Sequence, residues 1–126
     1  MAIRVAAAVI ERGARVLVTR RLEGTHLAGL WEFPGGKCEP GESIEACLVR
    51  ELREELGVDV TPGEILLVAT HAYPEKTVEV HFIACDMTGE PSPQQGQEMR
   101  WVERAALDTL EFPAADAELI SLLRRR

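Results

Sequence analysis

The chain of 126 residues has few cysteines and no long apolar run. Its three cysteines, Cys38, Cys47 and Cys85, are odd in number and widely spaced, so they form neither a CxxC pair nor a zinc-binding spacing. This usage is typical of reduced thiols, and we expect a cytoplasmic location. The apolar stretch of residues 1–10 lacks a cleavage site and is too short to cross a bilayer, which favours a first β-strand.

The chain also lacks a surplus of positive charge. It carries 14 Lys and Arg against 21 Asp and Glu, for a formal net charge of −7. We therefore expect no binding to a nucleic acid polymer through a basic surface. A small anionic ligand remains compatible with this charge, because a bound cation reverses the local field. Length and composition are those of one soluble globular domain, which we place at residues 1–126.

Acidic residues are concentrated between Gly36 and Val58. On a helix, Glu51, Glu54 and Glu55 stand at i, i+3 and i+4, so they project from one face within a single turn. Like charges at this spacing destabilise an isolated helix by about 0.2–0.5 kcal/mol per pair, and a divalent cation would reverse the effect. Oxygen ligands at this density suit Mg²⁺ or Mn²⁺. The trio predicts a metal site, with a solvated charged face as the alternative.

The same segment matches a named pattern. Gly36, Glu42 and the run Arg50-Glu51-Leu52-x-Glu54-Glu55-x-Gly57-Val58 resemble the Nudix box at every specified position, over residues 36–58. Residues 19–21, 31–37 and 112–116 resemble the flanking segments of the MutT branch, which hydrolyses nucleoside triphosphates. The resemblance implies an α/β fold, namely the Nudix-type α/β/α sandwich with a mixed β-sheet.

Apolar periodicity and turn residues predict the elements. Ser43 is a candidate N-cap and Gly57 a candidate C′ residue of one helix, and between them lies one apolar stripe: Ile44, Cys47, Leu48, Leu52 and Leu56. Residues 3–11 and 15–19 read as a hairpin, residues 64–71 and 76–86 as two paired strands, and residues 99–102 as a short strand. Residues 104–110 and 114–123 read as helices, the first one short.

The resemblance implies roles for the acids of the box. Glu51, Glu54 and Glu55 would hold Mg²⁺ (or Mn²⁺) together with the carbonyl of Gly35, and Arg50 would orient a glutamate. We expect Glu54 to be the general base, so the catalytic residues are Glu54, Glu51 and Arg50. In the MutT branch a loop carboxylate is the other candidate base. Its position here falls on Gln95, an amide, and Glu98 stands three residues later.

The resemblance also implies a substrate site. Its residues are Arg21, His26, Glu32, Phe33, Pro34, Gly35, Lys76 and Asp116. Arg21 and Lys76 would contact phosphates; the alternative for both is a surface charge without function. His26 would contact the substrate, and a solvated loop histidine is an equally good explanation. Asp116 takes the position of a base-reading asparagine; as an ionised, acceptor-only group it would favour guanine and cytosine. Its alternative is an acid that stabilises a helix N-terminus.

These features predict a metal-dependent enzyme that converts nucleoside triphosphates to monophosphate and pyrophosphate, with sanitation of 8-oxo-dGTP as the leading function. The alternatives are a pyrimidine triphosphate pyrophosphohydrolase acting on CTP or 5-methyl-dCTP, and an ADP-ribose-type nucleoside diphosphate hydrolase. A noncatalytic nucleotide-sensing domain is the non-enzyme alternative, but such domains commonly lose acids of the box, which are all present here. We expect a small nucleotide as the partner, no membrane, and a monomer or homodimer.

Overall fold

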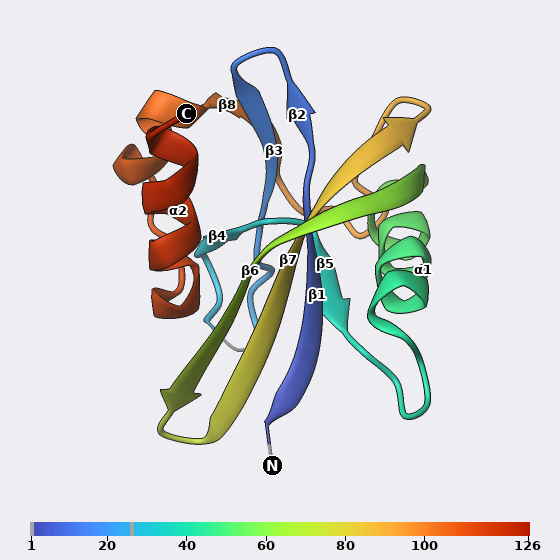
Figure 1. Cartoon of the computed structure of the whole chain (residues 1–126), viewed down its shortest axis with the longest axis vertical. Helices are drawn as coiled ribbons and strands as arrows, with labels where there is room; N and C mark the ends of the chain where they lie inside the picture. The colour runs from blue at the N-terminus through green and yellow to red at the C-terminus, as the bar shows by residue number, and fades with distance from the viewer. Residues whose placement is uncertain (1, 26) are drawn as a thin grey trace.

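The computed structural model describes residues 2–25 and 27–126 and places two helices on opposite sides of a layer of strands (Figure 1). α1 (Ile44–Leu56) covers one side and α2 (Ala117–Arg124) covers the other. The predicted α/β/α sandwich is therefore confirmed. Within the described residues, no helix has the length and apolar character needed to cross a membrane.

The larger sheet has the strand order β5-β1-β7-β6. β1 (Ile3–Val9) runs antiparallel to β5 (Gly35–Lys37) and parallel to β7 (Lys76–Thr88), which in turn pairs antiparallel with β6 (Asp59–Tyr73). The sheet is thus mixed, as predicted. Residues 6–8 of β1 are all alanines and at most 4% exposed, because the strand is covered on both faces and does not alternate between apolar and polar residues.

The second sheet is built around β3 (Arg15–Arg20), which pairs with β2 (Glu11–Arg12), β4 (Trp31–Glu32) and β8 (Met99–Glu103). The predicted hairpin is therefore wrong for residues 3–9. Both edges of β1 are occupied by β5 and β7, so only the short β2 is left to pair with β3.

α1 begins and ends where the sequence predicts. The Ser43 hydroxyl accepts a hydrogen bond from the Ala46 N–H at 3.1 Å, and Gly57 takes the left-handed conformation with φ 64°. The predicted apolar stripe is buried against the sheet: Ile44, Cys47, Leu48, Leu52 and Leu56. Glu55 is also buried, with only 8% of its surface exposed, so the acids do not all lie on an open face.

The remaining elements differ from the predictions in their extent. β6 begins at Asp59 instead of residue 64 and continues past Pro62 through shifts in register. Residues 104–110 form a 3₁₀ helix, η1 (Arg104–Thr109), and the last predicted helix begins as a 3₁₀ turn, η2 (Ala114–Asp116), before α2. These turns and α2 enclose a second apolar core on the face opposite α1, with Phe33 and Phe82 in an edge-to-face contact at 5.9 Å.

Candidate active site

A cavity of about 380 Å³ collects side chains from both sheets, α1 and the η2 turn. β1, β7 and Phe33 give it an apolar wall, and the charged groups come from the other elements. Eight of the residues predicted from the sequence line it: Arg21, Glu32, Phe33, Gly35, Glu51, Glu55, Lys76 and Asp116. The fold thus brings together residues that are far apart in the chain.

Three of the predicted residues, Pro34, Arg50 and Glu54, are not among those that line the cavity. The carbonyl of Pro34 accepts a hydrogen bond from the Ala8 N–H at 2.7 Å, so its backbone continues the ladder with β1. His26 lies outside the described residues.

The Arg50 guanidinium joins three carboxylates at the edge of the cavity. Nε and Nη2 donate to the two oxygens of Glu42 at 2.7 and 2.9 Å, and Nη1 donates to Glu51 at 3.0 Å and to Glu54 at 3.3 Å. The hydrogen bonds from Arg50, followed by one from the backbone of Glu39, lower the pKa of Glu42 to about 2. Through these hydrogen bonds, the Arg50 guanidinium fixes the side chain of Glu51 relative to Glu42 at the start of the helix.

The Glu51 carboxylate lies directly against the backbone of β5. A Cβ atom on Gly36 would lie 2.4 Å from the carboxyl carbon of Glu51, so only glycine leaves room for this contact. Burial raises the pKa of Glu51, while Arg50 opposes that shift and the charge of Glu54 adds to it. A cation at this position would relieve the same repulsion.

Glu55 reaches into the cavity from one helical turn beyond Glu51. Its Oε2 accepts a hydrogen bond from the Gly35 N–H at 3.0 Å. Burial, and then the charge of Glu32, raise the pKa of Glu55 to about 8. Glu54, in contrast, has 54% of its side chain exposed and points toward Arg50 at the outer surface of α1.

A second cluster of ionisable side chains, Arg21, Glu32 and Asp116, lies at the cavity near the η2 turn. Arg21 forms an ion pair with Glu32 at 2.8 Å, yet burial still raises the pKa of Glu32. Asp116 is 6% exposed and makes no helix-capping hydrogen bond through its side chain. Burial, followed by the charge of Glu32, raises its pKa to about 8.

The sequence predicts an ionised, acceptor-only Asp116, whereas burial and the charge of Glu32 raise the pKa of its carboxyl group and favour the neutral form. A helix N-terminus would lower the pKa of a nearby acid, whereas that of Asp116 is raised. Its carboxyl group is instead an acid held in a cavity, and in its neutral form it both donates and accepts hydrogen bonds.

The loop before β8 holds a residue that the sequence did not single out. Gln97 is 6% exposed; its amide donates to the Glu55 carbonyl at 3.1 Å and accepts from the Gln95 N–H at 3.0 Å. These bonds hold Gln95 at the cavity. Glu98 is exposed and paired with Arg20 at 2.9 Å, so it does not replace the missing loop carboxylate in this arrangement. A glutamine in a polar loop carries no periodic signal that would have revealed this role.

Comparisons with known proteins agree with this geometry. A family model described as the NUDIX domain matches residues 5–122. An 8-oxo-dGTP diphosphatase of Haemophilus influenzae is 42% identical over 123 residues, covering 96% of this chain and 90% of that protein. This chain belongs to the Nudix family. The CTP pyrophosphohydrolase of Escherichia coli is 40% identical over 120 residues, covering 93% of this chain and 86% of that protein.

Solved structures give the same result for the fold. The E. coli ORF135 protein superposes with a TM-score of 0.83 at 36% identity, over 94% of this Nudix chain and 86% of that one. A structure described as MutT, from a study of Aliivibrio salmonicida and Vibrio cholerae, gives 0.79 at 29% identity over 98% and 97%. As a Nudix hydrolase, the protein is an enzyme that acts on phosphoanhydride bonds.

Nudix hydrolases generally need a divalent metal, and Glu51, Glu54 and Glu55 of α1 offer carboxylate oxygens of the kind that such a metal binds. Among the described residues, no three acidic, histidine or cysteine side chains already converge as a metal site. Instead, Arg50 Nη1 lies within 3.0 Å of Glu51 and 3.3 Å of Glu54, so a positive charge already bridges two of the three acids. The third acid, Glu55, has its charged form disfavoured by burial. An all-oxygen donor set of this kind suits a hard cation.

Proposed function

We propose that this Nudix hydrolase converts nucleoside triphosphates to monophosphate and pyrophosphate with Mg²⁺ as its metal, and that 8-oxo-dGTP is its main substrate. The proposal rests on one observation: Glu51 and Glu55 of the Nudix box line the same cavity as Asp116. Support also comes from the 8-oxo-dGTP diphosphatase of H. influenzae, which is 42% identical.

Each group of residues has a proposed task. Glu51, Glu54 and Glu55, with the carbonyl of Gly35, hold the metal, which when bound neutralises phosphate charge and polarises the scissile bond. Arg21 and Lys76 face the cavity and supply positive charge to the phosphates. Arg50 orients Glu51 through the 3.0 Å bond.

Glu54 is our proposed general base, and this role sets a structural requirement. Because its carboxylate contacts Arg50 and does not line the cavity, it must rotate away from Arg50 before it can accept a proton from water near the phosphates. Gln95 lines the cavity but is an amide and cannot act as a base at neutral pH.

Base recognition is assigned to the end of the cavity beside η2. Glu32 and Phe33 lie along one wall, and Asp116 presents a carboxyl group that is mainly protonated below about pH 8. A neutral carboxyl group can pair with an acceptor and a donor side by side, which suits the oxidised guanine edge. Cytosine triphosphates are the second candidate, favoured by the 40% identity to the CTP pyrophosphohydrolase of E. coli.

A substrate panel distinguishes these candidates. The specificity constant kcat/KM is measured for 8-oxo-dGTP, dGTP, dCTP, CTP and dTTP with Mg²⁺, for the wild type and Asp116→Ala. We expect 8-oxo-dGTP to rank first and Asp116→Ala to lower its kcat/KM by about 10–100-fold, the effect of losing one or two buried hydrogen bonds. A first rank for CTP or dCTP would select the second candidate. Equal loss for all five nucleotides would remove Asp116 from base recognition.

We further propose that the protein works on the free nucleotides of the cytoplasm, as a monomer or homodimer. Its net charge of −7 supports small substrates over nucleic acid polymers.

A further inference from the structure

The interface between β5 and α1 places Cys38 opposite α1. Cys38 follows β5, and its N–H donates to the Arg4 carbonyl at 2.9 Å, so the ladder with β1 continues through it. Residues two apart on an extended strand face the same side, and Cys38 therefore faces the same side as Gly36. That side is turned to α1, because a Cβ on Gly36 would meet the Glu51 carboxyl carbon at 2.4 Å.

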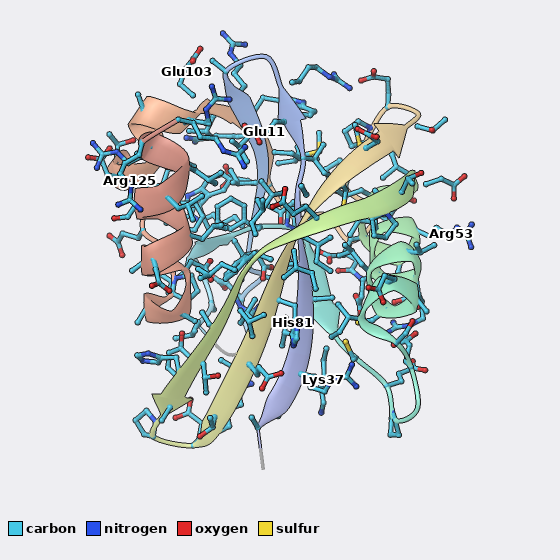
Figure 2. The ribbon with its side chains drawn as sticks, viewed as in Figure 1. Glu11, Lys37, Arg53, His81, Glu103 and Arg125 are labelled. Carbon is cyan, nitrogen blue, oxygen red and sulfur yellow. The ribbon has the colours of Figure 1, made fainter. Side chains whose placement is uncertain are left out.

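The register along this interface then pairs Cys38 with Cys47. α1 runs back along β5, as shown by the contact of Arg50 Nη2 with the Lys37 carbonyl at 3.2 Å, one step from the Gly36–Glu51 contact. Figure 2 labels Lys37 at this end of β5. From Gly36 to Cys38 the strand advances about 6.6 Å. From Glu51 back to Cys47 the helix advances about 6 Å and returns to the same face.

Direct contacts support this pairing. Cys47 Sγ lies 3.6 Å from the Gly36 carbonyl oxygen, and Cys38 packs against the buried cluster that contains Cys47. Burial raises the pKa of the Cys47 thiol, so the first oxidation falls on Cys38. Cys47 is fully buried whereas Cys38 is partly exposed, so a soluble oxidant reaches Cys38 first.

We propose that Cys38 and Cys47 are an oxidisable thiol pair whose disulfide locks α1 against β5 and slows the reaction at the Nudix box. Hydrogen peroxide is the oxidant. The Cys38 sulfur takes one peroxide oxygen to give a sulfenic acid, with release of water. The Cys47 sulfur then displaces the hydroxyl group from Cys38, and this group leaves as a second water with the Cys47 proton. Two thiols and one peroxide thus give one disulfide and two waters.

The lock acts through Glu51. A disulfide holds its two Cβ atoms about 3.8 Å apart, closer than two thiols in van der Waals contact require. One helical turn beyond Cys47, the Glu51 carboxyl group lies against Gly36, where even a Cβ atom would be 2.4 Å from its carboxyl carbon, so drawing α1 toward β5 displaces the carboxylate. A shift on the order of 1 Å in a catalytic group can lower the rate about 100-fold. This effect on turnover rests on the proposed function, whereas formation of the disulfide does not.

The test treats the full chain with hydrogen peroxide and maps the disulfides by peptide mass spectrometry, beside thermal melting and 8-oxo-dGTP hydrolysis. We expect a Cys38–Cys47 link, a melting temperature higher by about 5–10 °C, and turnover lower by about tenfold or more, all reversed by dithiothreitol. Cys85→Ser is the matched control and should behave as the wild type. Cys38→Ser should form no link and keep its turnover in peroxide, and Cys47→Ser is the second variant.

The possible results distinguish formation of the Cys38–Cys47 disulfide from its effect on turnover. Oxidation that stops at Cys38, or that joins two chains through it, would overturn the thiol pair. A Cys38–Cys47 link with unchanged turnover would overturn the lock. If the untreated wild type hydrolyses no nucleotide, the proposed function fails, and the mass map together with the melting temperature still decides whether the pair forms.

Discussion

The surroundings of the Asp116 carboxyl group favour its neutral form. Asp116 is 6% exposed, and the buried Glu32 repels a second negative charge, while Arg21 offsets only part of both effects. A neutral carboxyl offers the same donor and acceptor pair as an asparagine side chain. We therefore propose that the aspartate at this position acts as a titratable version of the asparagine in the MutT-like pattern.

This property predicts a pH-dependent substrate preference. As the pH rises from 7 to 9, Asp116 loses its donor, and kcat/KM for 8-oxo-dGTP relative to dCTP should fall by about tenfold, the worth of one hydrogen bond. Asp116→Asn does not titrate, so its ratio should stay flat over the same range. Steady-state kinetics of both forms with saturating Mg²⁺ check this. Parallel profiles for the two forms would show that another group controls the preference.

Glu54 is the acid whose function is least evident from its position. We predict that Glu54→Gln lowers kcat by about 10²–10⁴-fold with little change in melting temperature, because the side chain is 54% exposed and packs in no core. Glu45→Gln, which neutralises an exposed acid in the first turn of the same helix, is the control and should retain full turnover. Wild-type turnover in Glu54→Gln would remove Glu54 from both the metal site and the proton transfer.

The position of α1 relative to β5 depends on close contacts at β5. Two adjacent glycines set their distance in different ways. A Cβ on Gly35 would lie 1.9 Å from the backbone oxygen of Ala6, so Gly35 is required for β5 to pair with β1. The three atoms nearest a Cβ on Gly36 would all belong to the Glu51 carboxyl group, so Gly36 is required for the position of the acid.

Gly36→Ala should consequently fold but lose activity. The added methyl group displaces the Glu51 carboxylate, and we expect kcat to fall by about 100-fold. The stabilisation by Mg²⁺, measured as the shift in melting temperature between EDTA and Mg²⁺, should shrink as well. A variant with wild-type turnover and the full Mg²⁺ shift would show that Glu51 does not depend on this contact.

The burial of Glu55 makes α1 sensitive to pH when no metal is present. Its pKa is about 8 in the folded protein against 4.5 as its ordinary value, so the folded state binds more protons between these values. Its contribution to stability is complete below about pH 4.5 and is lost as the pH rises through about 8.

Glu55→Gln should therefore be more stable than the wild type at pH 9 in EDTA and about equally stable at pH 5. With Mg²⁺ the order at pH 9 should reverse, because the metal stabilises only the intact acid. Urea denaturation under these conditions gives the free energies of unfolding. The same ranking with and without Mg²⁺ would exclude Glu55 as a metal ligand.

Across the molecule, prediction from the sequence succeeded where a feature depends on residues close together in the chain. It failed where a feature depends on segments that meet only in the folded structure. The cap at Ser43, the turn at Gly57 and the apolar stripe of α1 are set by residues within a few positions of each other. The hairpin failed because pairing of β1 depends on β7, more than 60 residues later. The burial of Glu55 depends in the same way on the cavity wall beside it, which no helical period reveals.

The site shows the same division. The three acids of α1 follow from their spacing in the sequence. Arg21, Lys76 and Asp116 reach one cavity only through the fold, and the sequence pointed to them only through the resemblance to the Nudix family. Gln97 belongs to no pattern and became visible only through its bonds to Glu55 and Gln95. Its position explains how the part of the loop that carries Gln95 is held at the cavity.

The central claim is that the chain is a metal-dependent nucleoside triphosphate pyrophosphohydrolase, and product analysis tests it most directly. 8-oxo-dGTP is incubated with the protein in Mg²⁺ and in excess EDTA, and the products are resolved by ³¹P NMR. We expect 8-oxo-dGMP and pyrophosphate in equal amounts with Mg²⁺, and no turnover in EDTA. Release of inorganic phosphate with a diphosphate product, or equal turnover in EDTA, would contradict it.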